Sequence, residues 1–265
     1  MHAPFTPPTI EPETLMLAYR SGIFPMADRR DDPEIFWVEP RLRAILPLDG
    51  FHLSHSLART LKRGRFAVTC NAAFADVLDA CAAPRADEEG SWISHRIQAS
   101  YERLHALGQA HSVECWEVAN DGTRALVGGL YGVGFDRVFC GESMFSRRTD
   151  ASKVALSWLV AALRLAGVQL LDCQFITPHL ASLGAVEISQ ERYLRLLRRA
   201  QSGSFPAGSS SGVGVAVGDG AGLGRAEAPP LALPEAFGAL LSEASSAGLS
   251  SSPGKLIAHF LTQTS

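Results

Sequence analysis

Three consecutive residues, Asp172, Cys173 and Gln174, stand at the end of a predicted buried strand and form the sharpest chemical pattern in the chain. Because side chains alternate along a strand, Asp172 and Gln174 should share one face and Cys173 the other. A carboxylate at the edge of an apolar strand needs a partner or a task, because an unpaired buried charge is costly. The pair is therefore a candidate for proton handling, the alternative being a structural carboxylate that caps the turn around Thr177.

A second carboxylate, Glu142, lies in a glycine-containing segment that is also predicted to be a strand. Glu142 and Met144 project from one face of this strand and Ser143 from the other. Gly141 leaves space for a ligand against the backbone. The segment is therefore a candidate binding site, and a solvated glutamate near a loop is the alternative.

Other reactive side chains have ordinary structural interpretations. Taken alone, Trp37 and Trp92 are more typical of a packed core than of a stacking platform. A thiol nucleophile at Cys140 or Cys173, paired with a histidine, is a minor alternative, because a buried cysteine without an activating charge behaves as a small apolar residue.

Positive charge gathers in two places, although the chain has a formal net charge of -3. A polyanionic partner would need such a local concentration, because the total charge does not attract one. Two basic clusters beside one site would supply the field that a phosphate backbone requires, and ordinary surface solvation is the alternative. The first cluster contains Arg41, Arg43, Arg59, Lys62, Arg63 and Arg65, and the second contains Arg147, Arg148 and Lys153.

The composition is that of an ordinary globular protein of 265 residues, 46% hydrophobic and 19% charged. Its five cysteines form no C-x-x-C pair, so neither a disulfide framework nor a zinc site is predicted, and reduced thiols in a cytosol fit better. The sequence has no signal-peptide pattern and no apolar stretch of about 18 residues. We therefore expect a cytoplasmic protein that neither spans a membrane nor binds a metal.

The elements that must position these residues alternate between strand and helix patterns from residue 51 to about 200. Asn120-Asp121-Gly122 is a strong hairpin signal between two strands. Antiparallel strands followed by a helix, a strand and a closing helix predict an α+β sheet domain with helices packed on it. The expected strands are 112–118, 125–133, 138–145 and 170–175, and the expected helices are 14–21, Ser94 to Gly108, 150–167 and one that begins at Ser189.

The chain is predicted to have three parts. Residues 1–50 form a small N-terminal domain, 51–200 the catalytic sheet domain, and 201–265 a Gly/Ser-rich linker and C-terminal tail. Residues 202–230 are dominated by Gly, Ser, Ala and Pro and cannot bury enough apolar surface to offset their ordering entropy. The last 35 residues are expected to form one or two weak helices.

Several ordered segments resemble the bacterial leucyl/phenylalanyl-tRNA–protein transferases. The match covers roughly residues 15–197 in the family's order, which makes it more specific than any single motif, and nothing after about residue 201 has a counterpart. The segments are YRSGIFP at 19–25, WI at 92–93, residues 104–114, LVGGLYGV at 126–133, FCGESMFS at 139–146, ASK at 151–153, LDCQ at 171–174 and HLASLGA at 179–185.

The resemblance implies a small N-terminal domain beside an acetyltransferase-like (GNAT-type) α+β domain with a mixed sheet. It implies transfer of Leu, and also Phe and Met, from aminoacyl-tRNA to the N-terminal Arg or Lys of acceptor proteins, which marks them for N-end-rule degradation. No cofactor is expected, because the donor ester is already activated. An acetyl-CoA-dependent N-acyltransferase on the same fold is the alternative, but the turn from Ser146 to Asp150 lacks the glycine-rich loop that cradles a pyrophosphate. A binding module without turnover is a third possibility.

The resemblance also implies roles for individual residues. Gln174 contacts the attacking amine and Asp172 polarises it, while Glu142, beside Gly141, engages the acceptor. Where the family usually has two adjacent tryptophans, this chain has Phe36-Trp37. Donor specificity is assigned to an apolar pocket of Leu130, Met144, Leu159 and Leu171, and stacking on the terminal adenosine to Trp37 and Trp92. From the first basic cluster, we expect Arg63 and Arg65 to contact the tRNA.

Overall fold

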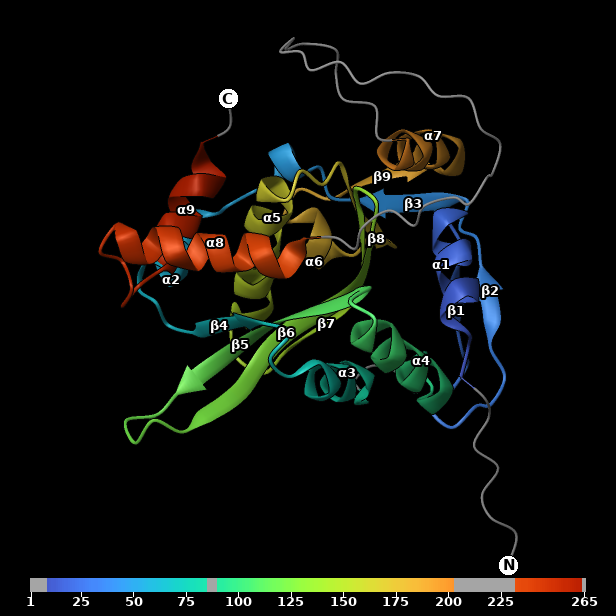
Figure 1. The fold of residues 1–265 in the computed structure, drawn as a ribbon, viewed down its shortest axis with the longest axis horizontal. Coiled ribbons are helices and arrows are strands. Elements are labelled where there is room, and N and C mark those ends of the chain that lie inside the picture. The colour runs from blue at the N-terminus through green and yellow to red at the C-terminus, as the bar shows by residue number, and fades with distance from the viewer. Residues whose placement is uncertain (1–8, 85–89, 203–231, 264–265) are drawn as a thin grey trace, which may run out of the picture.

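The computed structural model describes residues 9–84, 90–202 and 232–263, and its centre is a seven-stranded mixed sheet (Figure 1). The strand order is β4-β5-β6-β7-β8-β3-β9, and neighbours are antiparallel except for the parallel pair β7 and β8. A parallel pair needs a crossover, which helix α5 (Ala151–Leu165) provides. The strands are β3 (Leu42–Ile45), β4 (Ala67–Cys70), β5 (Ala110–Val118), β6 (Arg124–Phe135), β7 (Val138–Ser146), β8 (Leu170–Gln174) and β9 (Val186–Ser189).

The predicted hairpin around Gly122 is confirmed. Gly122 has a φ of 85°, in the left-handed region that glycine adopts freely, and β5 pairs with β6 on either side of this turn. Strand β6 then pairs with β7 and carries a bulge at Tyr131 and Gly132. A side chain at Gly132 would place its Cβ 2.2 Å from the Cys140 carbonyl oxygen. The seven-stranded sheet and the helices that accompany it confirm the α+β class predicted from the sequence.

The first part of the chain divides between two sheets. Helix α1 (Pro12–Arg20) is followed by the short antiparallel pair β1 (Phe24–Met26) and β2 (Phe36–Val38). The next strand, β3, leaves this pair and enters the large sheet between β8 and β9. Residues 42–45 are thereby carried into the centre of the molecule.

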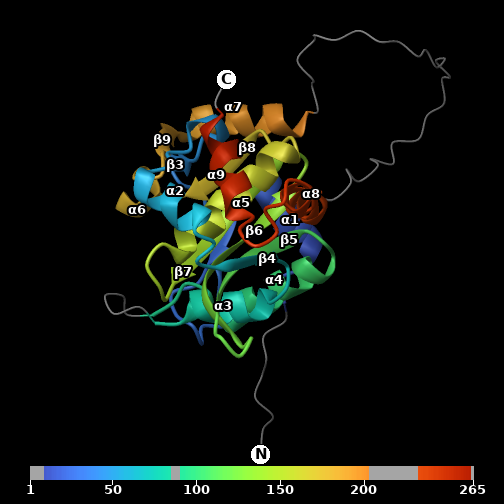
Figure 2. The ribbon, with the colours of Figure 1, turned by 90° about the vertical axis from the view of Figure 1, so that its left-hand side faces the viewer.

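Helices cover both faces of the large sheet (Figures 1 and 2). Along β7, Phe139 belongs to the core on the α5 side, whereas Val138 and Cys140 belong to the core on the opposite side, as strand alternation requires. The α5 side also holds α2 (His55–Lys62), the 3-10 turn Leu48–Gly50 and the two C-terminal helices. The opposite side holds α1, α3 (Phe74–Ala82), α4 (His95–Ala106) and α7 (Gln190–Gln201).

The two C-terminal helices, α8 (Leu233–Ser246) and α9 (Gly254–Thr262), belong to the main core. Leu240 and Ile257 are fully buried, and the Phe237 ring lies 5.0 Å from the Trp158 ring of α5. The expected weak helices are therefore packed helices that cover one face of α5, as Figure 2 shows. The predicted linker, apart from Ser202, lies outside the described residues.

Capping interactions begin two of the predicted helices. The Ser94 hydroxyl accepts a hydrogen bond from the Ile97 backbone N–H at the start of α4, and Ser189 caps α7 in the same way. Asp150 precedes α5 as predicted but has a φ of 70° and caps no backbone group. Its carboxylate instead accepts a hydrogen bond from the Thr60 hydroxyl at 3.2 Å, which ties the start of α5 to α2.

Candidate active site

A cavity of about 520 Å³ lies where β6, β7 and β8 meet the beginning of α5 and the short helix α6 (Pro178–Ala181). This volume is in the range of small-molecule sites. Much of its lining is aliphatic, including Leu156 and Leu180. The four residues predicted to form an apolar pocket all lie there, namely Leu130, Met144, Leu159 and Leu171.

Four buried polar atoms of cavity-lining residues have no hydrogen-bond partner among the described residues. They are Oε1 of Glu142, Nε2 of Gln174, the hydroxyl of Tyr131 and Nε2 of His179. Buried polar groups in proteins are normally paired, so four such atoms around one cavity indicate groups available to a ligand. They comprise an acceptor, a donor, and a hydroxyl and an imidazole nitrogen that can each act as either, which suits a ligand with both an amine and a carbonyl group.

Glu142 is held in place by two tyrosines from other elements. Its side chain is buried, and its Oε2 accepts a hydrogen bond from the Tyr101 hydroxyl at 3.1 Å. The Tyr101 hydroxyl in turn makes a short hydrogen bond with Tyr19. Burial raises the pKa of Glu142 to about 7, and the neighbouring Gln174 side chain acts against this shift. Helical spacing marked Tyr101 only as a core residue, because the contacts of α1 and α4 with this strand are distant in sequence.

Asp172 lies behind the cavity wall and does not line it. Its fully buried carboxylate accepts four hydrogen bonds. Two come from Nε and Nη2 of Arg43, at 2.9 and 2.6 Å, and the others come from the Tyr193 hydroxyl at 2.9 Å and the Gln174 backbone N–H at 2.8 Å. The structure thus makes Asp172 an anchor for the backbone of Gln174.

At the end of β8, Cys173 packs against the core on the α5 side, whereas the Asp172 carboxylate contacts Tyr193 of the opposite side. Cys173 and Gln174 both line the cavity, whereas Asp172 does not. The backbone of Gln174 has a φ of 60°, which lies in the left-handed region and ends the regular extended conformation. Such a conformation is uncommon outside glycine and is concentrated at functional sites. The residue type of Gln174 does not predict this positive φ.

Arg43 was grouped with surface cations in the sequence-based prediction, and this grouping is wrong. Its side chain is 1% exposed, and its guanidinium lies 4.7 Å from the centre of the Phe24 ring and 4.6 Å from that of Tyr193. Nη1 also donates to the Gly22 carbonyl at 3.1 Å. Burial acts to lower the pKa of Arg43, but the Asp172 carboxylate holds it above its usual range. Arg43 is buried because β3 lies beside β8.

Of the remaining predicted site residues, some line the cavity and others lie outside it. Trp92 and Gly141 line the cavity, whereas Trp37 lies on β2, is 42% exposed and does not line it. Burial raises the pKa of the Cys140 and Cys173 thiols. The structure therefore disfavours the thiolate that a cysteine nucleophile needs.

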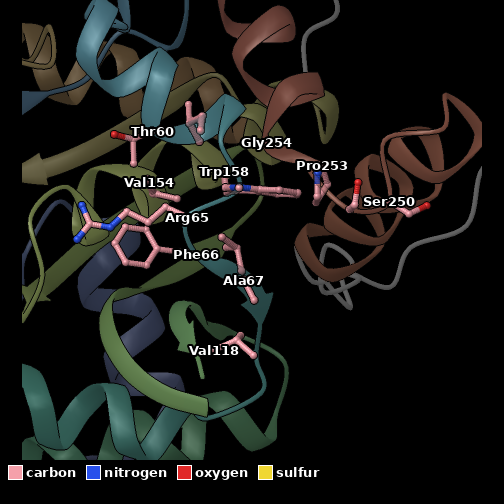
Figure 3. A pocket seen from close by; sticks show the side chains of 14 residues that line it. Thr60, Arg65, Phe66, Ala67, Val118, Val154, Trp158, Ser250, Pro253 and Gly254 are labelled. Carbon is pink, nitrogen blue, oxygen red and sulfur yellow. The ribbon is translucent and has the colours of Figure 1, made fainter. Parts of the chain in front are cut away.

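A second groove, of about 330 Å³, lies between residues 250–254, which join α8 to α9, and residues of α2, α5 and β4 (Figure 3). Trp158 forms part of its wall, with Pro253 of the tail beside it. Arg65 lies at one end, with its guanidinium 5.0 Å from the centre of the Phe66 ring. Four exposed cations near this groove have no carboxylate partner within the described residues, namely Arg59, Lys62, Arg63 and Arg65.

Two family models establish what class of protein has this fold and site. Residues 45–198 match the model described as leucyl/phenylalanyl-tRNA protein transferase, and residues 9–41 match the model of the N-terminal domain of the same transferase. The chain is thus a transferase. It belongs to the leucyl/phenylalanyl-tRNA protein transferase family.

Individual relatives agree with this assignment. The chain is 63% identical to a leucyl/phenylalanyl-tRNA–protein transferase of Novosphingobium aromaticivorans over 268 residues, which cover 98% of each chain. Two proteins of the same name, from Zymomonas mobilis and Cereibacter sphaeroides, are 54% and 56% identical over 196 and 198 residues. These cover 74% and 75% of this chain and 71% and 88% of the relatives. The similarity to the first relative therefore extends into the C-terminal tail.

Two further features concern membranes and metals. Within residues 9–84, 90–202 and 232–263, no helix has the length and apolar character to cross a membrane. The same ranges contain no group of three or more His, Cys, Asp or Glu side chains arranged to hold a metal ion.

Proposed function

We propose that this protein moves leucine, and also phenylalanine and methionine, from aminoacyl-tRNA to the N-terminal arginine or lysine of acceptor proteins. The observation that carries the proposal is the apolar cavity whose wall presents an unpaired carboxylate oxygen, amide nitrogen and hydroxyl. The floor suits an apolar donor side chain, and the polar wall suits the meeting of an ester and an amine. We place the reaction in the cytoplasm, where it marks its products for N-end-rule degradation.

The donor needs no further activation, because the ester that joins the amino acid to the ribose is already an activated acyl donor, with the ribose oxygen as its leaving group. The acceptor α-amine has a reference pKa of about 7.7 to 8.0, so on the order of a tenth is neutral at pH 7. The site must hold this amine against the ester carbonyl, receive a proton and stabilise the oxyanion that develops. None of these tasks requires a metal or a nucleotide cofactor.

Positions in the structure support a division of roles among the cavity residues. Gln174 orients the amine through its side-chain amide, and Asp172 holds the backbone of Gln174 by the 2.8 Å hydrogen bond. Glu142, next to Gly141, engages the charged end of the acceptor. The aliphatic floor favours leucine over smaller donor side chains by about 1 to 3 kcal/mol per methylene.

The tRNA is assigned to the surface between the cavity and the exposed cations. Trp92, on the cavity wall, stacks on the 3′-terminal adenosine, and the exposed Trp37 provides a second aromatic surface for the nucleotide end. Arg63 and Arg65, beside the groove of Figure 3, contact phosphates of the acceptor arm.

For the fold, we propose a GNAT-type domain over residues 51–200, whose sheet also takes in β3 from a small N-terminal domain over 1–50, and a linker and tail over 201–265, whose helices α8 and α9 pack on that domain. The parallel β7–β8 pair joined by α5, beside a run of antiparallel strands, supports this assignment. The turn between β7 and α5 contains no glycine, so it offers no phosphate cradle of the kind that acetyl-CoA would use.

One transfer assay tests the proposal. The protein is incubated with a peptide that begins with Arg, together with labelled Leu-tRNA or labelled acetyl-CoA, and peptides beginning with Lys or Asp serve as comparisons. We expect label from Leu-tRNA on the Arg and Lys peptides only. Transfer from acetyl-CoA alone would instead support an N-acetyltransferase, and binding of Leu-tRNA without transfer would support a binding module. Phe-tRNA and Met-tRNA test the range of donors.

A further inference from the structure

The four exposed cations near the groove of Figure 3 all belong to one short piece of backbone, the last turn of α2 and the three residues that follow it. They are Arg59, Lys62, Arg63 and Arg65. The helix has only eight residues, and a helix of this length is marginal in water unless tertiary contacts hold it. The directions in which the cations project therefore depend on what packs against α2.

The C-terminal tail supplies such a contact at the end of α2. Helix α9 lies beside α2 (Figures 1 and 2). In the turn that joins α8 to α9, the Ser252 hydroxyl donates a hydrogen bond of 2.7 Å to the Lys62 carbonyl. The last four carbonyl groups of a helix lack partners within the helix, so the tail satisfies a backbone group at the end of α2.

The backbones of the tail and α2 also touch directly. Gly254, the first residue of α9, is buried, and a Cβ at this position would lie 2.3 Å from the Leu61 carbonyl oxygen. Gly64, just after α2, has a φ of 61°, and a Cβ there would lie 3.2 Å from the Ser252 hydroxyl oxygen. The contact at Gly254 has no room for a methyl group, so the place of the tail fixes the place of the last turn of α2.

The tail is itself firmly attached. The side chains of Leu233, Leu240 and Ile257 are completely buried in the main core. On another side, the hydrogen bond of 3.2 Å between the Thr60 hydroxyl and the Asp150 carboxylate ties α2 to the start of α5. Helix α2 is thus held between two supports. Such a frame keeps four mutually repelling cations together on one surface, where their fields add.

We infer that the α8–α9 turn shapes the tRNA-binding surface, with Ser252 and Gly254 as positioning residues that hold the last turn of α2 and its cations toward the tRNA phosphates. The inference rests on the proposed aminoacyl transfer, in which Arg63 and Arg65 contact the tRNA. Neither positioning residue has to touch the nucleic acid. Ordered cations lose less side-chain and backbone freedom on binding, which favours affinity.

The chemical step should not depend on this contact, because the groove and the cavity lie on different faces of α5. Val154 and Trp158, four residues apart, line the groove, whereas Leu156 and Leu159 line the cavity. A change in the α8–α9 turn should therefore alter the affinity for Leu-tRNA and leave turnover at saturation nearly as it is. This separation distinguishes positioning of the cations from general support of the fold.

Gly254→Ala in the full chain tests the inference. Relief of the contact with Leu61, to an ordinary C···O distance of about 3.3 Å, moves the tail and α2 apart by roughly 1 Å. The Kd for Leu-tRNA should rise about 3- to 10-fold, and the slope of log K against log salt should fall by about 1. At saturating Leu-tRNA and Arg peptide, kcat should stay within about twofold of wild type. An unchanged Kd and slope would overturn the inference, and so would a loss of kcat as large as the loss of affinity.

Two changes at Ser252 test the hydrogen bond, and an exposed serine of the same tail is the matched control. Ser252→Ala should raise the Kd for Leu-tRNA by about 2- to 5-fold, because the Lys62 carbonyl loses its partner. Ser252→Thr keeps a hydroxyl and should bind more tightly than the Ala variant, and equal affinities would count against the hydrogen bond. Ser242→Ala on α8 should leave the Kd unchanged. Urea unfolding confirms that each variant is folded at the assay temperature.

A double-variant cycle separates positioning from direct contact with the tRNA. In a chain with Ala at all four cationic positions, adding Gly254→Ala should change the Kd at low salt by less than about 1.5-fold, because the tail then has no cations to position. An equal loss in both backgrounds would show that the tail contributes its own contacts, and it would overturn the positioning role.

Failure of the proposed function remains distinguishable from failure of this inference. If wild type neither binds Leu-tRNA nor transfers leucine from it, the proposed function fails. If wild type transfers leucine, but Gly254→Ala and Ser252→Ala bind Leu-tRNA as wild type does, only the role of the tail fails.

Discussion

Replacing Asp172 by Asn should cost a large part of the stability of this protein, because the change leaves a buried guanidinium without its counter-ion. Asp172 is completely buried and Arg43 is 1% exposed, so water cannot replace the lost charge. Asn keeps one acceptor oxygen and places an NH2 donor where the other oxygen was, so at least one of the hydrogen bonds of 2.6 and 2.9 Å from Arg43 is lost. Breaking a buried ion pair on one side typically costs about 3 to 5 kcal/mol, against a total stability of about 5 to 15 kcal/mol.

Urea unfolding at pH 7, followed by tryptophan fluorescence, measures this loss. With an m-value of about 2 to 3 kcal/mol per M, the midpoint should fall by about 1 to 2.5 M. The control is Glu191→Gln, which removes an exposed ion pair with Arg195 and should cost no more than about 0.5 kcal/mol. If both variants lose similar stability, the buried pair does not have the energetic role assigned to it.

A double variant and the transfer assay extend this test. Arg43→Met combined with Asp172→Leu removes both charges and should cost less than the sum of the two single changes, because neither charge is left unpaired. In the transfer assay, Asp172→Asn should lower turnover by more than about tenfold, because a neutral amide oxygen holds the Gln174 backbone N–H less firmly than the carboxylate does. Its affinity for Leu-tRNA should stay nearly unchanged, and an equal loss of both quantities would make Asp172 purely structural.

Three further predictions concern other parts of the molecule. Arg63→Ala with Arg65→Ala should weaken Leu-tRNA binding and reduce the slope of log K against log salt by about 1 per removed contact, and an unaltered slope would exclude these residues from the interface. Because burial raises the folded pKa of Glu142 to about 7, its protonation stabilises the folded state at low pH, and this contribution is lost as the pH rises through 7. Glu142→Gln should therefore match wild-type stability near pH 4 and exceed it at pH 8 by up to the order of 3 kcal/mol in denaturant titrations. Gly132→Ala should destabilise the protein by about 1 to 3 kcal/mol in thermal unfolding, whereas Gly238→Ala, with nothing within 4 Å of the added methyl, should stabilise it by about 0.5 to 1 kcal/mol.

Local sequence signals predicted those elements whose start or end is decided by a few neighbouring residues. Gly122 predicted the β5–β6 hairpin because a tight turn needs a residue that accepts a positive φ. Ser94 predicted the beginning of α4 because its hydroxyl can accept a hydrogen bond from a free backbone N–H. Such signals need no knowledge of the rest of the chain.

Features that depend on distant pairing were not predictable in this way. The burial of Arg43 follows from the insertion of β3 between β8 and β9, and no pattern within four residues encodes those partners. The support of Glu142 by Tyr19 and Tyr101 joins three elements that are far apart in sequence. Gln174 has a left-handed backbone conformation, and its N–H donates a hydrogen bond to the Asp172 carboxylate, a contact that residue types alone do not reveal.

The place of β3 in the sheet also sets an order for synthesis on the ribosome. Residues 42–45 emerge early, but their partners β8 and β9 begin about 130 and about 145 residues later, which at about 5 to 20 residues per second is a delay of about 6 to 29 s. During this interval the nascent strand has free edges on both sides, and Arg43 has no counter-ion. The candidate catalytic centre can therefore assemble only when most of the sheet domain has left the exit tunnel, and incomplete chains should be inactive.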